Sequence, residues 1–93
     1  MTMLFLARMD VHLPAEMPTD EADAIKKAES EYSQALQREG AWQSLWRVVG
    51  EYANYSIFDV ASNDELHSIL SGLPLFPYME IHVTPLANHP SAI

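Results

Sequence analysis

The order of strand-like and helix-like segments leaves few folds open to this chain. Apolar residues recur at helical spacing in two segments. Residues 3–12 are apolar at both parities, residues 41–48 and 52–60 are rich in aromatic and β-branched side chains, and apolar and polar residues alternate at 78–85. This pattern predicts a strand, a helix, a hairpin of two strands, a second helix and a final strand, at residues 3–12, 19–40, 41–48 and 52–60, 62–72, and 78–85. A βαββαβ order is typical of an α+β, ferredoxin-like domain, in which right-handed crossovers place both helices on one face of a four-stranded antiparallel sheet.

Residues that start and stop helices support these boundaries. Thr19 is a good N-cap, acidic residues follow it in the first turn, and Gly40 provides a C-terminal stop. Ser62 and Glu65 have the spacing of a capping box for the second helix. The six prolines fall where elements are expected to end, and no repeat or linker divides the sequence. We therefore expect one domain over residues 1–93.

The predicted strands carry apolar side chains on both faces. In the first strand, Phe5 and Met9 alternate with Leu4 and Leu6, which is typical of a central strand covered on both sides. The helices cover only one face of the predicted sheet. A chain of 93 residues with 48% hydrophobic content and no cysteine has few other means of burying the second face. We therefore expect this open face to pack against a second copy, as in a dimeric α+β barrel, within a homo-oligomer.

Charge and composition exclude several classes of function. Five Lys and Arg against thirteen Asp and Glu give a net charge of -8, which disfavours nucleic acid and anionic membranes as partners. No phosphate-binding glycine motif or nucleophile elbow is present. The segment up to Val11 reaches Arg8 and Asp10 too early for a signal peptide or a spanning helix, which predicts a soluble cytoplasmic protein.

A metal site is not expected either. There is no cysteine, and the four histidines have no metal-ligand spacing and are expected at exposed positions or strand ends. These histidines are His12, His67, His82 and His89. In so acidic a chain, an anion site would have to be local and built on one of the few cations, which are Arg8, Lys26, Lys27, Arg38 and Arg47.

One carboxylate falls on the apolar side of the first predicted helix. At about 100° per residue, Glu29 lies within a narrow apolar stripe. The other members of this stripe are Ala22, Ile25, Tyr32 and Leu36. A carboxylate that is desolvated there has a raised pKa, which suits proton abstraction from carbon, so Glu29 is a candidate general base. An ion pair with Arg8 or Arg47, or a place at the edge of the stripe, would also account for it.

The predicted hairpin concentrates aromatic and polar side chains. Its large aromatic residues are Trp42, Trp46, Tyr52 and Tyr55, and packing at a subunit interface would explain most of them. Asn54 and Ser56 are unexpectedly polar for the middle of a central strand. Either they bind a ligand, or they form hydrogen bonds with each other or with a buried water.

Several segments together resemble the muconolactone isomerases. The resemblance rests on residues 45–47 with Gly50, 52–56, 58–60 and the irregular stretch LPLFPYM at 73–79, and it continues through 3–5, 13–14, 37–40 and 89–91. It covers nearly the whole chain from Met3 on. A long irregular stretch such as LPLFPYM makes it much more specific than any short motif.

The resemblance implies a cofactor-free isomerase of aromatic catabolism. In the catechol branch of the β-ketoadipate pathway, such enzymes convert muconolactone, a small anionic lactone, to 3-oxoadipate enol-lactone, and the family forms homodecamers. The glutamate regarded as the base of the family corresponds to Glu29, which favours the catalytic interpretation. Hydrogen-bond donors for the dienolate intermediate would come from Trp46, Tyr52, Asn54 and Tyr55, and Arg8 or Arg47 would hold the carboxylate of the substrate.

One position departs from the pattern of the family. A histidine often stands where this chain has Glu51, and an acid near the pocket would repel an anionic lactone. Two alternatives to the isomerase remain open. A chloromuconolactone dehalogenase would share the fold and the base, and a non-catalytic ferredoxin-like binding or assembly module would use Glu29 only as an ion-pair partner.

Overall fold

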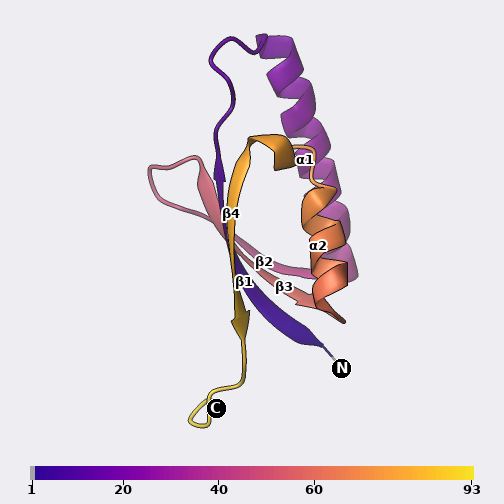
Figure 1. The fold of residues 1–93 in the computed structure, drawn as a ribbon, viewed down its shortest axis with the longest axis vertical. Helices are drawn as coiled ribbons and strands as arrows, with labels where there is room; N and C mark the ends of the chain where they lie inside the picture. The colour runs from indigo at the N-terminus through magenta and orange to yellow at the C-terminus, as the bar shows by residue number, and fades with distance from the viewer. Residues whose placement is uncertain (1) are drawn as a thin grey trace.

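A computed structural model describes residues 2–93, and its elements follow the predicted order. They are β1 (Met3–Val11), α1 (Thr19–Glu39), β2 (Trp42–Arg47), β3 (Ala53–Val60), α2 (Asn63–Ser71), a 3-10 turn η1 (Phe76–Tyr78) and β4 (Met79–Leu86). The strands form one antiparallel sheet in the order β2-β3-β1-β4, and both helices lie on the same side of it (Figure 1). The predicted α+β, ferredoxin-like fold is therefore confirmed. Met1, which the predicted domain 1–93 includes, lies outside the described residues.

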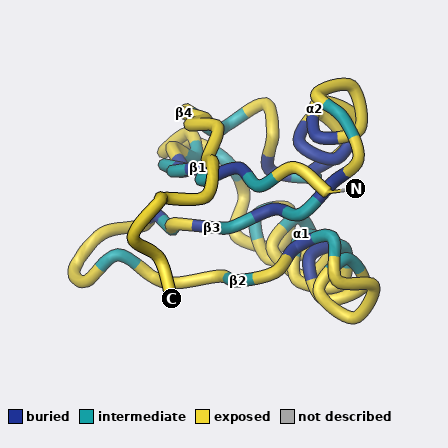
Figure 2. The backbone as a smooth tube through the Cα atoms, turned by 90° about the horizontal axis from the view of Figure 1, so that it is seen from below, coloured by how far each residue is buried: buried dark blue, intermediate teal, exposed yellow. Residues whose placement is uncertain are grey.

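The central strand β1 shows how the sheet meets the helices. Phe5, Ala7, Met9 and Val11 are buried, whereas the residues between them are only partly buried. Because successive side chains of a strand point to opposite faces, the buried set faces the helices. Figure 2 shows the same pattern, with buried segments on β1 and β3 and mostly exposed segments on the outer strands β2 and β4.

The core joins the sheet to α2 and to the second half of α1. Trp42 of β2 is only 2% exposed, and its ring centroid lies 4.8 Å from that of Phe58 on β3. Tyr32 and Leu36 of α1 pack against the same cluster. Trp42 is thus a core residue of its own chain, so the interface packing expected for the hairpin aromatics does not apply to it. The first turns of α1 extend past the end of α2 (Figure 1).

The helix ends follow the sequence signals with one exception. Gly40 closes α1 in the left-handed conformation at φ 88°, and the hydroxyl of Ser62 accepts a 3.1 Å hydrogen bond from the backbone N–H of Glu65. The predicted N-cap at Thr19 is wrong, because α1 already begins at Thr19. Pro18 occupies the cap position, where its carbonyl accepts the first helical hydrogen bond, from Ala22.

The face of the sheet away from the helices is partly exposed and combines apolar residues with charged ones such as Arg8 and Asp10. It carries Leu4, Leu6, Trp46, Tyr55, Ile57 and Leu86, and Trp46 is 66% exposed. The expectation of an open face is therefore confirmed for the single chain. Its covering by a second copy stays a prediction.

Candidate active site

A cavity of about 420 Å³ lies between α1, the β2–β3 hairpin and the segment that follows α2. Its lining includes Glu29 from α1, Trp42 and Arg47 from β2, Tyr52 before β3, and Leu75 before η1. Its volume is within the range of small-molecule sites. Elements from both halves of the chain therefore build one pocket, with Glu29 on its wall.

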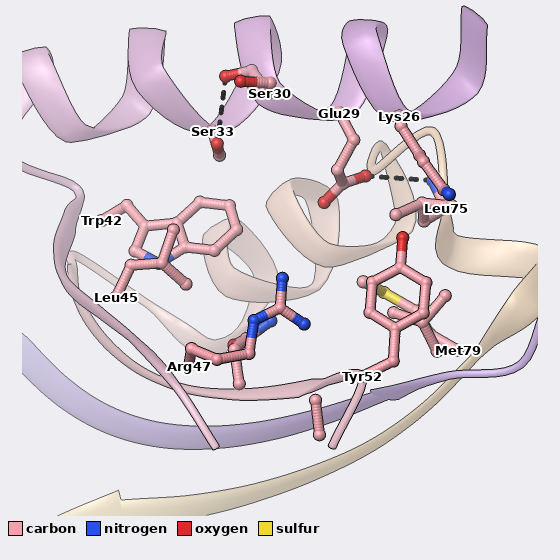
Figure 3. A pocket seen from close by; sticks show the side chains of 13 residues that line it. Lys26, Glu29, Ser30, Ser33, Trp42, Leu45, Arg47, Tyr52, Leu75 and Met79 are labelled. Atoms are coloured by element: carbon pink, nitrogen blue, oxygen red, sulfur yellow. Dashed lines mark hydrogen bonds between the residues drawn. The ribbon is translucent and has the colours of Figure 1, made fainter. Parts of the chain in front are cut away.

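Glu29 lies at the boundary between the pocket and the interior, as its place on the helix stripe predicts. One carboxylate oxygen, Oε1, accepts a 3.0 Å hydrogen bond from the backbone N–H of Leu75. Figure 3 shows the other oxygen pointing into the cavity. The ion pair with Arg8 or Arg47 that would have explained this carboxylate does not occur among the described salt bridges.

The surroundings of Glu29 favour its protonated form more than water does. Burial raises the pKa of its carboxyl above the ordinary value of 4.5, while the hydrogen bond from Leu75 opposes this rise because it stabilises the charged form. The group therefore combines partial desolvation with one fixed oxygen and one free oxygen. A carboxyl group of this kind can act as a general base toward a carbon acid.

Two cations border the same pocket. Nζ of Lys26 and Cζ of Arg47 lie 5.7 Å and 5.3 Å from the centroid of the Tyr52 ring. Within residues 2–93, neither cation forms a salt bridge. Figure 3 shows both side chains with Tyr52 at the cavity. In a chain with a net charge of -8, this is a local positive site that suits a carboxylate.

The polar residues of β3 satisfy each other, as one of the two sequence interpretations proposed. The hydroxyl of Ser56 donates a 2.7 Å hydrogen bond to Oδ1 of Asn54. Asn54 nevertheless lines the pocket. Because its carbonyl oxygen is engaged, its amide NH₂ is the group that is left to donate to a ligand.

Trp42 lines the cavity, and its buried Nε1 has no hydrogen-bond partner within the described part of the chain. A buried indole N–H without an acceptor is costly, so Nε1 would gain from donating a hydrogen bond to a ligand oxygen or a water.

Three of the predicted substrate-binding residues do not reach this pocket. Arg8, Trp46 and Tyr55 lie on the opposite face of the sheet, where Arg8 pairs with Tyr55 across β1 and β3, and Tyr55 pairs with Trp46 across β3 and β2. Arg8 is fully engaged there, with Nε 3.0 Å from Asp10 and Nη2 2.9 Å from Glu51. The hydrogen bond from Arg8 also lowers the pKa of Asp10.

The ion pair with Arg8 also changes the expectation for Glu51. Its carboxylate is bound to Arg8 and does not line the pocket. The predicted repulsion of an anionic lactone by Glu51 is therefore reduced, because Arg8, which also pairs with Asp10, offsets part of its charge and holds its carboxylate outside the pocket.

The sequence interpretation missed three parts of the site. Lys26 stands three residues before Glu29, so the helical period already placed it near the same face. Trp42 was predicted to serve in packing, and only its unpaired Nε1 indicates a further role at the pocket. The N–H of Leu75 is a backbone group, and no side-chain pattern predicts its position.

The described residues contain neither a cluster of metal ligands nor a membrane-spanning helix. Within residues 2–93, no three His, Cys, Asp or Glu side chains are grouped as metal ligands, and the four histidines are exposed as expected. In the same range, no helix is long and apolar enough to cross a membrane.

Comparisons with known proteins agree on one family. Residues 3–92 match the sequence model of the family described as muconolactone delta-isomerase. The muconolactone delta-isomerase of Cupriavidus pinatubonensis is 71% identical over 91 residues, which cover 98% of this chain and 99% of the relative. Muconolactone delta-isomerase 1 of Acinetobacter lwoffii is 66% identical over 91 residues, with 98% of this chain and 95% of the relative covered.

A solved structure extends this similarity to the fold. The crystal structure of a muconolactone isomerase has a TM-score of 0.94 and 54% identity to this chain, and the match covers 98% of this chain and 95% of the other. Sequence and fold therefore agree over almost the whole length, and the chain belongs to the muconolactone delta-isomerase family.

Proposed function

We propose that the pocket around Glu29 isomerises muconolactone to 3-oxoadipate enol-lactone by general-base proton transfer. The observation that carries this proposal is the carboxylate of Glu29, which has one oxygen bound to Leu75 and the other directed into the cavity. Relatives with 50 to 71% identity are named muconolactone delta-isomerase, which supports the same reaction here. Those names give no support to a dehalogenase or to a non-catalytic module.

In the first step, the free oxygen of Glu29 takes the proton from the ring carbon that bears the carboxymethyl group. The electrons of that C–H bond form a new C=C bond, the original C=C bond shifts, and negative charge collects on the lactone carbonyl oxygen. In the second step, the protonated Glu29 returns the proton to the carbon next to the carbonyl. One carboxylate serves both steps if it reaches both carbons from the same face of the ring.

The dienolate needs donors near its carbonyl oxygen. Two side chains with donors that are not used within residues 2–93 line the pocket, namely Tyr52 with its hydroxyl and Asn54 with its amide NH₂, and Trp42, whose buried Nε1 also lacks a partner there, lines it as well. Donors that are already fixed in place stabilise developing charge without reorganisation, which is the largest catalytic contribution in many enzymes. Trp46 and Tyr55, the other predicted donors, have no part in this proposal because they face away.

Lys26 and Arg47 hold the carboxylate of the substrate. Both approach the Tyr52 ring, and both lack an ion-pair partner within residues 2–93. The substrate carboxylate is attracted there by two positive charges, whereas the net charge of the chain, which is -8, repels anions. Arg8 is excluded from this role in its own chain because Asp10 and Glu51 already occupy it.

The reaction moves one proton and changes no overall oxidation state. Glu29 alone supplies the acid and the base, so the proposal requires neither a metal nor an organic cofactor. We further propose that the enzyme works in the cytoplasm as a homo-oligomer, with the apolar open face of the sheet covered by a second copy and a decamer built from such dimers. The exposed Trp46 and the partly exposed Leu4, Leu6 and Ile57 support this assembly.

The test is a spectrophotometric assay of the purified protein with muconolactone, before and after treatment with EDTA. We expect turnover that EDTA leaves unchanged. A second assay offers the chlorinated lactone and measures chloride release, which a dehalogenase would show and which we do not expect as the main activity. Activity that disappears with EDTA and returns with an added metal would refute the cofactor-free mechanism.

A further inference from the structure

A tyrosine of α1 ties this helix to the end of α2. The hydroxyl of Tyr32 donates a 2.7 Å hydrogen bond to the backbone carbonyl of Ile69. Tyr32 stands three residues after Glu29, so both side chains leave α1 on the same face. Burial raises the pKa of Tyr32, and the negative charge of Glu29 raises it further. The phenol is therefore neutral near neutral pH and remains a donor.

Gly72 makes room for this tyrosine. Its φ of -85° is an ordinary backbone angle, so glycine is not required there by conformation. A Cβ at this position would lie 2.6 Å from the hydroxyl oxygen of Tyr32, which is closer than real Cβ atoms approach. An alanine at this position would therefore have to displace Tyr32, and its Cβ would also lie 3.2 Å from the backbone carbonyl oxygen of Ser68.

The segment from Ile69 to Leu75 connects the carbonyl that accepts from Tyr32 to the N–H that donates to Glu29. Three backbone hydrogen bonds of 2.9 to 3.1 Å, from Gly72 to Ser68, Leu73 to Leu70 and Phe76 to Leu73, fold it into consecutive tight turns. Leu73 and Leu75 are buried within it. The carbonyl that accepts from Tyr32 and the N–H of Leu75 that donates to Glu29 therefore belong to one compact unit.

We propose that Tyr32 and Gly72 are positioning residues for the base. Their contact holds the 69–75 segment at the spacing from α1 at which the N–H of Leu75 meets Oε1 of Glu29, so that the second oxygen faces the substrate. The kinetic consequence rests on the proposed role of Glu29. The geometric claim, that Tyr32 controls the hydrogen bond to Leu75, does not.

Other groups near Glu29 must be separated from this effect. The charged and titratable groups that face it are Lys26 and Tyr32 from α1, Arg47 from β2, and Tyr52 before β3. Gly72→Ala replaces none of these groups, and the one that it displaces, the hydroxyl of Tyr32, is uncharged. Any change that this substitution causes in the pKa of Glu29 therefore arises from the displacement of Tyr32 and of the 69–75 segment and not from a lost charge.

The experiment measures the pKa of Glu29 directly, by ¹³C NMR of the intact protein labelled at glutamate carboxyls, with Glu29→Gln used to assign the resonance. We expect Tyr32→Phe and Gly72→Ala each to raise this pKa by about one pH unit, because the hydrogen bond from Leu75 that stabilises the charged form is weakened. We expect kcat to fall roughly tenfold with little change in KM, since the base is displaced while the substrate contacts remain.

Tyr78→Phe is the matched control. It also removes a tyrosine hydroxyl, but the hydroxyl of Tyr78 forms no hydrogen bond with another residue within residues 2–93. We expect it to leave the pKa of Glu29 unchanged. A Tyr32→Phe protein with a lowered melting temperature but an unchanged or lower pKa of Glu29 would show a purely structural tyrosine and overturn the proposal.

A double-mutant cycle gives an independent test. Removing the hydroxyl of Tyr32 also removes the atom that a Cβ at position 72 would meet at 2.6 Å, so Gly72→Ala should change the pKa much less in the Tyr32→Phe background. Fully additive effects would contradict the contact as the cause. Because the titration needs no turnover, it decides this proposal even if Glu29→Gln retained isomerase activity and so refuted the proposed function.

Discussion

The backbone N–H of Leu75 donates a 3.0 Å hydrogen bond to Oε1 of Glu29, across 46 positions in the sequence. This contact makes the two oxygens of one carboxylate different from each other. One oxygen is fixed by the protein, and the other points into the cavity (Figure 3). This hydrogen bond restricts Glu29 to few rotamers, so the base is already oriented before the reaction begins.

Replacing the base should abolish most of the activity. Glu29→Gln keeps the shape of the side chain and an oxygen that can accept from Leu75, but its amide cannot take a proton. We expect kcat to fall by roughly 10²-fold or more, which is the usual cost of losing a general base. Steady-state kinetics with muconolactone measure this, with light scattering as the check that assembly survives. A Glu29→Gln protein with near wild-type kcat would move the search to another base.

The pH profile should report the same carboxyl group. Because burial raises the pKa of Glu29, the base becomes protonated and inactive at a higher pH than an exposed glutamate would. We expect the acid limb of kcat/KM to have an apparent pKa above 4.5, the ordinary value for this side chain. Rates measured across the acid range test this. An acid limb at or below 4.5, in a protein that stays folded there, would contradict the raised pKa.

The stability of the protein should depend on the same titration, and the contribution of Glu29 should fall as the pH rises. Between the ordinary pKa of 4.5 and the raised pKa, the folded protein holds more protons than the unfolded chain. The contribution of Glu29 to stability is therefore fully present below 4.5 and is lost as the pH rises through the raised pKa. Because glutamine does not titrate, the stability of Glu29→Gln relative to wild type should increase from pH 4.5 to about pH 8.

Chemical denaturation of both proteins at the two pH values, at one protein concentration, measures this difference. A difference in unfolding free energy that stays constant with pH would show that Glu29 has the same pKa in the folded and unfolded states.

The anion site should be separable from the base. Lys26→Met and Arg47→Met each remove one of the two cations that border Tyr52. We expect KM to rise about tenfold or more with a smaller change in kcat, since the carboxylate contact is present in both the ground state and the transition state. Lys27→Met is the control, because it makes the same change at an exposed neighbouring position. An equal effect of all three substitutions would indicate only the loss of overall charge.

The general architecture could be predicted from the sequence because its signals are local. Helical period, the capping pair Ser62 and Glu65, and the stop at Gly40 lie within a few residues of the elements that they define. The prediction of Thr19 as the N-cap was wrong because Pro18 occupies the cap position, so that Thr19 is the first residue of the helix. Glu29 could be found for the same local reason, since one helix turn on either side places it on the apolar stripe.

The faces of the hairpin could not be predicted, because a bulge changes them. The register of β2 against β3 shifts between Trp42 and Ser44. Simple alternation from Trp42 would have placed Trp46 toward the helices, but the extra residue turns Trp46 outward and brings Arg47 to the pocket. Arg8 was assigned to the pocket from its charge alone, and the alternation of β1 places it on the other face.

The last prediction concerns the open face of the sheet. Leu6 lies there, between Ile57 of β3 and Thr84 of β4, and its apolar neighbours are only partly covered within the chain. We expect the wild-type protein to be a homo-oligomer in light scattering at micromolar concentration, and Leu6→Glu to shift it toward the 10.5 kDa chain because a buried carboxylate without a partner is costly. Ala35→Glu is the control, since Ala35 is exposed on α1, on the other side of the sheet from this face (Figure 1). A wild-type protein that remains a stable monomer would refute the predicted assembly, and an oligomer that Leu6→Glu leaves intact would show that the copies meet through another surface.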